Sequence, residues 1–284
     1  MTDFNLKSGI SEDDYHGDRT TLSSTGARKL LACPARFKWD CDNKQPTSKA
    51  FEFGKLAHRL VLGEGSPIQV VDAENWMTNA AKELRDIARA NRVTPVLRAD
   101  YDMACSLRDS VMAHPIAAAI FADGIAERSG YWRDEPTDIG LKFRPDWLTD
   151  FFGRPTCVDL KTTISADPVE FSRSVARYGY HAQAAWYLDG LAANGIDDAA
   201  FLFVAVEKTA PYPVSVIELD DEAIAEGRRM NRRAIDLYDR CMRADDWPAY
   251  GDLIHTMSLP RWAMRDGIND DAQQLINELK GITA

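Results

Sequence analysis

The stretch RPDWLTDFFGRPTCVDLKTT, residues 144–163, alternates apolar and polar side chains on both sides of a Gly-Arg-Pro turn. This pattern predicts two antiparallel strands joined by a tight hairpin. Because side chains alternate across a strand, Asp159 and Lys161 share one face of the second strand while Leu160 points to the opposite face. A hairpin that returns from the segment FRPDWL can bring the carboxylate of Asp146 next to Asp159.

Two carboxylates within a few ångströms of each other repel unless a cation lies between them. Oxygen ligands favour Mg²⁺ or Mn²⁺, and such an ion polarises a phosphate and lowers the pKa of a bound water. A nearby lysine ammonium can orient that water or neutralise the charge that develops in the transition state. Asp146, Asp159 and Lys161 therefore predict metal-dependent cleavage of phosphodiester bonds. The simpler alternative for so short a pattern is an ion pair on a solvated strand edge.

The composition narrows the class of protein. The 284 residues, 45% of them hydrophobic, can bury a substantial core, and one large domain is expected. A formal net charge of −10 argues against a protein that coats nucleic acid or anionic membrane with its whole surface, but allows a local basic groove. The chain shows neither a membrane-length apolar run nor a secretory signal, so a cytoplasmic protein without membrane partners is expected. Five cysteines without a Cys-x-x-Cys pair predict neither a zinc site nor an iron–sulfur cluster.

Hydrophobic periodicity divides the chain into helices and strands. A three-stranded antiparallel meander is expected at 125–163. Two later strands complete a mixed five-stranded sheet flanked by helices, which is an α/β fold. The expected helices cover residues 22–40, 49–64, 73–123 with breaks near Pro95 and Pro115, 167–195 and 220–246, and the two later strands cover 199–208 and 212–219.

The expected domain boundaries follow from the same pattern. The polar residues 1–20 are predicted to be a flexible segment, and 21–265 to form one domain. The short WPAY and LPRWA segments are expected to close its core, and residues 266–284 are expected to form a helical tail.

Seven motifs follow one another along the chain: LSSTGARKLLACPARF, GKLAH, AERSGYW, RPDWL, VDLKTT, YHAQAAWYLDGL and LPRWA. In this order they resemble the RecB-like branch of the PD-(D/E)xK nucleases, and within it the phage-type exonuclease VIII (RecE-like) group. The resemblance covers roughly residues 20 to 265. It implies a restriction-endonuclease-like PD-(D/E)xK core with extra N-terminal helices.

The resemblance assigns roles to the residues at matching positions. It implies that Asp146 and Asp159 are metal ligands and that Lys161 is the catalytic lysine. His58 and the backbone carbonyl of Leu160 are implied as the remaining ligands. A lone helical histidine is more often a packed or surface residue, but a neutral imidazole can complete an oxygen-rich shell.

Gln183 and Tyr187 match the Gln-x-x-x-Tyr motif of the same family. Four residues apart on a helix, they lie on one face and can both reach a DNA phosphate or the lysine. An amphipathic helix with a half-buried Tyr187 is the alternative. Glu127 matches a first-strand glutamate in the metal shell or just outside it, although an exposed strand charge is equally compatible with its position.

Basic residues near these motifs are expected to contact the DNA backbone without reading its sequence, and such contacts weaken with salt. Taken one by one, most of them are also compatible with solvated surface charges. The candidates are Arg28, Lys29, Arg36, Lys38, Lys142, Arg144, Arg173 and Arg177.

The resemblance implies an Mg²⁺-dependent exonuclease of bacterial or phage origin that degrades linear double-stranded DNA in the 5′-to-3′ direction. The 3′ overhangs would serve a single-strand annealing partner, and a ring-shaped homo-oligomer such as a tetramer is implied. No Gly-x-x-x-x-Gly-Lys-Ser/Thr motif is present, so no ATP is expected to be needed. Two alternatives stay open: another RecB-like nuclease, for single-stranded ends or CRISPR adaptation, and a non-catalytic DNA-binding module that retains the fold.

Overall fold

The structure is a computed structural model that describes residues 6–43 and 49–259. Contacts divide the chain into two units, Met1–Ala249 and Tyr250–Ala284. The described part of the second unit, residues 250–259, contains no helix or strand, so all elements below belong to the first unit. Residues 260–263 of the LPRWA segment and the predicted tail at 266–284 lie outside the described residues, and the proposed domain boundaries stay a prediction.

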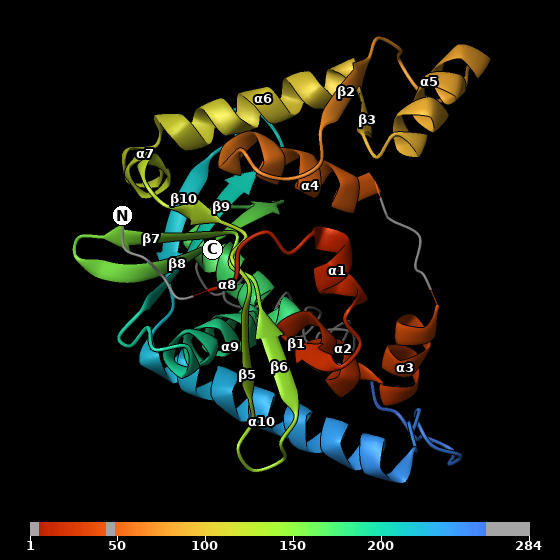
Figure 1. The fold of residues 1–284 in the computed structure, drawn as a ribbon, viewed down its shortest axis with the longest axis vertical. Coiled ribbons are helices and arrows are strands. Elements are labelled where there is room, and N and C mark those ends of the chain that lie inside the picture. Colours follow the sequence, from red (N-terminus) through yellow and green to blue (C-terminus); the bar gives the residue numbers. More distant parts are fainter. Residues whose placement is uncertain (1–5, 44–48, 260–284) are drawn as a thin grey trace, which may run out of the picture. The chain divides into compact units, whose positions relative to one another are not determined.

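A five-stranded mixed sheet forms the centre of the first unit (Figure 1). Its strand order is β10-β9-β8-β7-β4, with β8 and β9 parallel and the other neighbours antiparallel. This confirms the predicted α/β fold with a mixed five-stranded sheet. The strands are β4 Ile125–Ala126, β7 Trp147–Phe151, β8 Arg154–Thr163, β9 Ala200–Glu207 and β10 Val214–Glu218.

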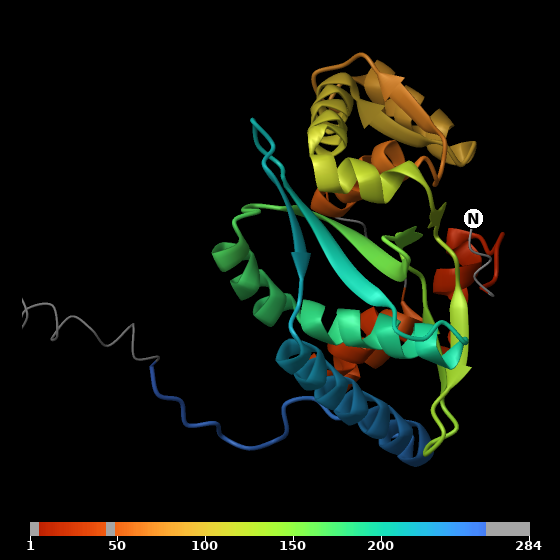
Figure 2. The same ribbon diagram turned by 90° about the vertical axis from the view of Figure 1, so that its left-hand side faces the viewer.

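Helices cover both faces of this sheet, which buries its two central strands (Figures 1 and 2). One face packs on α4 Lys49–Leu62, α6 Arg98–Ala113 and α7 Pro115–Ala122 through residues such as Leu160 and Val204. The other face packs on α8 Pro168–Tyr178 and α9 Tyr180–Ala193 through residues such as Phe201 and Phe203, and α10 Asp221–Ala244 packs against α9. Among the described residues, no helix combines the length and the apolar character that crossing a membrane requires.

The N-terminal elements are α1 Glu12–Gly17, β1 Thr21–Ser23, α2 Ser24–Ala32 and α3 Pro34–Asp42, and α2 packs against α9 and α10. The side chain of Ser23 caps α2 by accepting a hydrogen bond from the amide of Gly26, and Pro34 starts α3, so the helix expected at 22–40 is divided in two. Trp247 of the WPAY segment packs against the rings of Phe37 and Tyr238, so this part of the segment does close the core.

The expected three-stranded meander at 125–163 is wrong. This stretch forms five strands in two sheets, because β5 Gly130–Arg133 and β6 Gly140–Phe143 pair with each other and β6 also pairs in parallel with β1. The chain leaves β6 through Arg144 and Pro145 before β7 begins. A proline lacks the amide that a continued ladder needs, and β7 pairs with β8 and β4 instead.

Two further expected helices are also interrupted. Within the helical stretch expected at 73–123, Thr94–Leu97 forms β3, which pairs in parallel with β2 Ile68–Val71 and follows α5 Asn79–Ala90. β-Branched residues around Pro95 favour this extended segment over a helix. The helix expected at 167–195 is divided into α8 and α9 at Gly179, whose φ of 66° belongs to the left-handed region.

Candidate active site

The β7–β8 hairpin carries the first part of the site. In β8, Val158 and Leu160 are buried on the side of α4 and α6, whereas Asp159 and Lys161 point toward α9. Asp146 lies just before β7, and its Oδ2 accepts a hydrogen bond of 2.8 Å from the backbone amide of Leu160. The hairpin therefore brings both aspartates to the same stretch of β8.

His58 reaches this stretch from α4. Its Nε2 lies 2.7 Å from the carbonyl oxygen of Leu160, and its Nδ1 lies 3.5 Å from Oδ2 of Asp146. Because a carbonyl oxygen only accepts, Nε2 supplies the hydrogen of the first contact. The four groups that the resemblance implies as metal ligands thus lie along one short segment, although 102 positions separate His58 from Leu160 in the chain.

Gln183 on α9 links Asp159 to Lys161. Its Nε2 donates to Oδ1 of Asp159 at 2.5 Å, and its Oε1 accepts from Nζ of Lys161 at 3.3 Å. The Lys161 ammonium also lies 2.5 Å from Oδ2 of Asp159 as an ion pair. That oxygen is buried and has no hydrogen bond of acceptable direction within the described part of the chain. Gln183 therefore orients both the carboxylate and the lysine.

The electrostatics of the site disfavour two ionised carboxylates. Burial raises the pKa of Asp146 to about 6. His58 opposes this shift, and the negative charge of Asp159 adds to it. Burial also raises the pKa of Tyr187 well above its ordinary value, and the Tyr187 ring packs edge-on against Phe143. A raised carboxyl pKa beside a second carboxylate is typical of positions that bind a cation or transfer a proton.

The donor set fits a hard divalent ion in its chemistry. Two carboxylates, a carbonyl oxygen and an imidazole suit Mg²⁺ or Mn²⁺. The buried Oδ2 of Asp159 already has a cation beside it, the Lys161 ammonium at 2.5 Å, so a bound ion would share this carboxylate with the lysine. Within the residues that the structure describes, no three His, Cys, Asp or Glu side chains are close enough together to hold a metal ion. The oxygens of Asp159 contact Lys161 and Gln183 instead.

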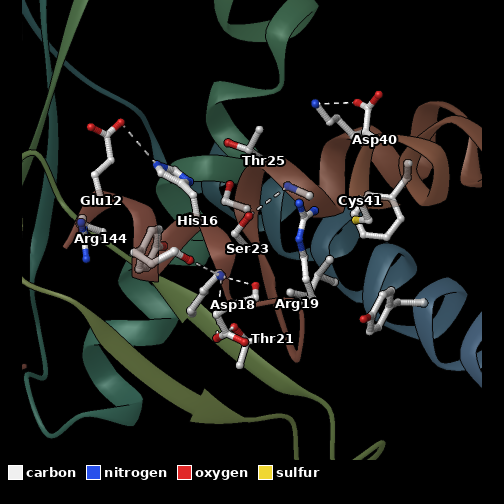
Figure 3. A pocket seen from close by; sticks show the side chains of 18 of the residues that line it. Glu12, His16, Asp18, Arg19, Thr21, Ser23, Thr25, Asp40, Cys41 and Arg144 are labelled. Carbon is white, nitrogen blue, oxygen red and sulfur yellow. Dashed lines mark hydrogen bonds and ion pairs between the residues drawn. The ribbon is translucent and has the colours of Figure 1, made fainter. Parts of the chain in front are cut away.

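Asp146 and Tyr187 line a cavity of about 700 Å³. Its wall comes mainly from α1, β1, α2 and α3, and Arg19, in the loop between α1 and β1, is one of the lining residues that Figure 3 shows. Glu127 follows β4 at the rim, where it is exposed. Its backbone amide donates to the carbonyl oxygen of Asp146 at 3.3 Å, so it is connected to the site through the backbone. A direct role of its carboxylate stays a prediction.

The structure contradicts the expectation that Lys142 contacts DNA. Lys142 is only 4% exposed, and its ammonium donates to the carbonyl oxygens of Tyr15 and Asp18 at 2.6 and 2.8 Å. The neighbouring Arg144 donates to the side chain of Ser129 and to a backbone carbonyl, and its guanidinium lies over the Tyr15 ring. Both basic side chains therefore hold the N-terminal segment, and Lys142 is not available to a phosphate.

The other predicted DNA contacts lie at the surface or in ion pairs, and their role stays a prediction. Three of them form ion pairs: Lys29 with Asp40, Lys38 with Asp42 and Arg173 with Glu170. The guanidinium of Arg177 lies over the Tyr178 ring, and Arg36 is exposed. Arg28 donates hydrogen bonds to the backbone carbonyls of residues 178 and 179.

One residue of the site was not predicted from the sequence. The ring of Tyr180 lies under the ammonium of Lys161, with 4.7 Å between Nζ and the ring centroid. Its position three residues before Gln183 could have identified it, since residues three apart share a helical face.

The family described as "PDDEXK-like domain of unknown function (DUF3799)" matches residues 23–260 of the chain. A solved protein of Eubacterium rectale, classed as an exonuclease by inference, shares the fold with a TM-score of 0.61. It is 12% identical and covers 92% of this chain and 98% of its own. A phage-related exonuclease from Haemophilus somnus 129PT has a TM-score of 0.32 and 14% identity, over 80% of this chain and 96% of its own. None of the curated proteins matches the sequence.

Proposed function

Because the chain belongs to the PDDEXK-like domain family DUF3799 and has a nuclease fold, we propose that it is a divalent-metal-dependent DNA exonuclease that needs no ATP. The observation that carries this proposal is the convergence of His58, Asp146, Asp159, Lys161 and Gln183 on one segment of β8. The raised pKa of Asp146 beside a second buried carboxylate supports the same proposal, because such positions are typical of sites that bind a cation.

The residues have separate parts in the proposed reaction. Asp146, Asp159, His58 and the Leu160 carbonyl would hold the ion, which supplies Lewis acidity and a more acidic bound water. The Lys161 ammonium would neutralise the charge that develops on the phosphate. Gln183 keeps the Asp159 carboxylate and the lysine in register, as its two hydrogen bonds indicate.

We propose linear double-stranded DNA as the substrate, with removal of the 5′-ended strand. A single-strand annealing protein as partner and a ring-shaped homo-oligomer belong to the same proposal. The support for these finer statements is the order of the sequence motifs, which resembles the exonuclease VIII group. The wall of α1 to α3 beside Asp146 supports action at ends, since it borders the cavity next to the site.

The test uses a linear duplex labelled separately at each 5′ and 3′ end, and a closed circular duplex, with Mg²⁺ or chelator and with or without ATP. We expect Mg²⁺-dependent, ATP-independent loss of the 5′ label from linear DNA and no attack on the circle. Lys161→Ala should lower kcat by roughly 10²- to 10³-fold, and Asp159→Ala should abolish cleavage.

Asp150→Ala is the matched control, because this carboxylate lies on β7 of the same hairpin and is exposed. It should keep wild-type activity. Equal activity of the wild type, Asp159→Ala and Lys161→Ala would refute the proposed site, and DNA binding without any cleavage would favour the non-catalytic alternative.

A further inference from the structure

The ammonium of Lys161 lies against aromatic rings as well as beside a carboxylate. Its Nζ is 4.7 Å from the centroid of the Tyr180 ring and 5.9 Å from that of Phe203. The Tyr180 ring packs against Phe203 and Phe171, with centroid distances of 5.6 and 5.9 Å. A ring supported in this way offers a fixed face to the ammonium, and the cation–π attraction limits where the ammonium can lie.

The break between α8 and α9 places this ring. Gly179, in the left-handed region, ends α8, and Tyr180 is the first residue of α9. Gln183 lies one turn further along, so its amide and the Tyr180 ring both contact Lys161. The orientation of the α8–α9 junction therefore decides where the lysine ammonium is held.

Arg28 of α2 holds this junction from outside. Its guanidinium donates to the carbonyl oxygens of Tyr178 and Gly179, at 3.1 and 3.3 Å, and to the hydroxyl of Thr25 at 3.3 Å. The carbonyl of Tyr178 is one that the end of α8 leaves without a helical partner, and a basic side chain in this position satisfies it. The carbonyl of Gly179 also accepts from the amide of Gln183, so Arg28 contacts the first hydrogen bond of α9 as well. The fit is tight, because a Cβ on Gly179 would lie 3.0 Å from Cδ of Arg28.

We propose that Tyr180 and Arg28 are positioning residues for the catalytic lysine: the Tyr180 ring restrains the Lys161 ammonium, and Arg28 fixes the junction that presents the ring. This inference rests on the proposed nuclease function. A lysine side chain is long and flexible, and a displacement of about 1 Å at a reacting group can cost about 100-fold in rate. In this proposal Arg28 acts on the site through the backbone of the α8–α9 junction, and not through the contact with DNA expected from the sequence.

The first test compares two substitutions of Tyr180. Tyr180→Leu removes the ring and should lower kcat by about 10- to 100-fold with little change in KM for DNA. Tyr180→Phe keeps the ring face and should retain the wild-type kcat. Tyr101→Leu, a partly buried tyrosine of α6 away from the site, is the control for general loss of packing. A defect of equal size in Tyr180→Phe and Tyr180→Leu would overturn the role of the ring.

A double-mutant cycle tests whether Tyr180 acts through Lys161. In a Lys161→Met background, Tyr180→Leu should cause no further loss of kcat, because the group it restrains is gone. A structural defect would instead multiply with the loss caused by Lys161→Met. Full multiplication of the two effects would therefore refute the proposal.

Arg28→Met separates positioning from DNA binding. Loss of a phosphate contact would raise KM and reduce the salt dependence of binding, whereas loss of a positioning clamp should lower kcat and leave KM and the salt dependence as they are. Arg154→Met is the matched control, since Arg154 also donates to backbone carbonyls but lies at the opposite end of β8 from the lysine. An increase in KM without a loss of kcat would overturn the role given to Arg28.

A measurement without catalysis distinguishes failure of this proposal from failure of the proposed function. The unfolding equilibrium in urea of wild type, Tyr180→Leu, Lys161→Met and the double variant should show a coupling of about 2- to 30-fold. If the wild type does not cleave DNA but the coupling is present, the proposed function fails and the ring–lysine contact stands. If the two substitutions are independent in unfolding, the positioning proposal fails whatever the activity.

Discussion

Replacing Asp146 by asparagine should stabilise the metal-free protein at neutral pH while it removes nuclease activity. The pKa of Asp146 is about 6, against an ordinary 3.8. A difference of about 2 units at about 1.4 kcal/mol each means that ionising this carboxyl lowers the free energy of unfolding by about 3 kcal/mol. Asparagine has nearly the same shape, and its amide oxygen can still accept the hydrogen bond from the Leu160 amide.

The expected gain depends on pH with a definite sign. Between pH of about 4 and about 6, the folded wild type binds more protons at Asp146 than the unfolded chain. The contribution of this group to stability is therefore fully present below about pH 4, and it is lost as the pH rises through about 6. The variant lacks this titration, so the gain should be near zero at the acidic end and about 2–3 kcal/mol at neutral pH.

Urea unfolding of both proteins in the presence of a chelator, at an acidic and at a neutral pH, measures the effect. Asp150→Asn is the control, because it removes an exposed carboxylate from the same hairpin and should change the unfolding free energy little at either pH. An Asp146→Asn protein that is no more stable than wild type at neutral pH would show that burial does not penalise this carboxylate. The electrostatic part of the site description would then be wrong.

The remaining predictions concern the packing that supports the site. Gly227→Ala should lower the free energy of unfolding in urea by about 1–2 kcal/mol, because a Cβ there would lie 2.3 Å from the carbonyl oxygen of His181 on α9. Gly54→Ala should instead raise it by up to about 1 kcal/mol, because the nearest atom to a Cβ at Gly54 is 3.9 Å away. Equal changes in unfolding free energy for Gly227→Ala and Gly54→Ala would contradict the close contact between α9 and α10 at Gly227. Lys142→Met removes the donor to two carbonyls of the α1 segment, so it should lower the free energy of unfolding by about 3 kcal/mol and speed amide exchange in α1. Lys38→Met, at a lysine paired with Asp42 near the surface, should change both quantities little. Unchanged exchange in α1 would show that Lys142 does not hold that segment.

Hydrophobic periodicity predicted where most of the strands lie, but it did not predict that they divide between two sheets. Alternation in β8 correctly separates Asp159 and Lys161 from the buried Val158 and Leu160, because a strand has only two faces. Periodicity does not say which strands pair, and β6 joins β5 and β1 in a second sheet that involves residues more than 100 positions away. Strand pairing depends on long-range contacts, which a local pattern does not contain.

The convergence of the site residues followed from the resemblance more than from the pattern itself. Nothing in the helix around His58 indicates that its imidazole meets the carbonyl of Leu160. Conversely, a charge on an alternating strand does not reveal whether it faces DNA or the protein, so Lys142 was wrongly expected to contact DNA. Tyr180 shows the opposite case, since a helical spacing already present in the sequence puts it beside Gln183.

Two groups of buried charges, one under α1 and one at the site proposed on β8, differ in how the protein satisfies them. Burial lowers the pKa of Lys142, but its ammonium is satisfied by two carbonyl oxygens and lies near the carboxylate of Asp18. At the site on β8, burial raises the pKa of Asp146, and the buried Oδ2 of Asp159 has the Lys161 ammonium as its partner at 2.5 Å. The cost of ionising Asp146 beside a second buried carboxylate is one that a bound cation would lower, which is the role proposed for the ion at this site.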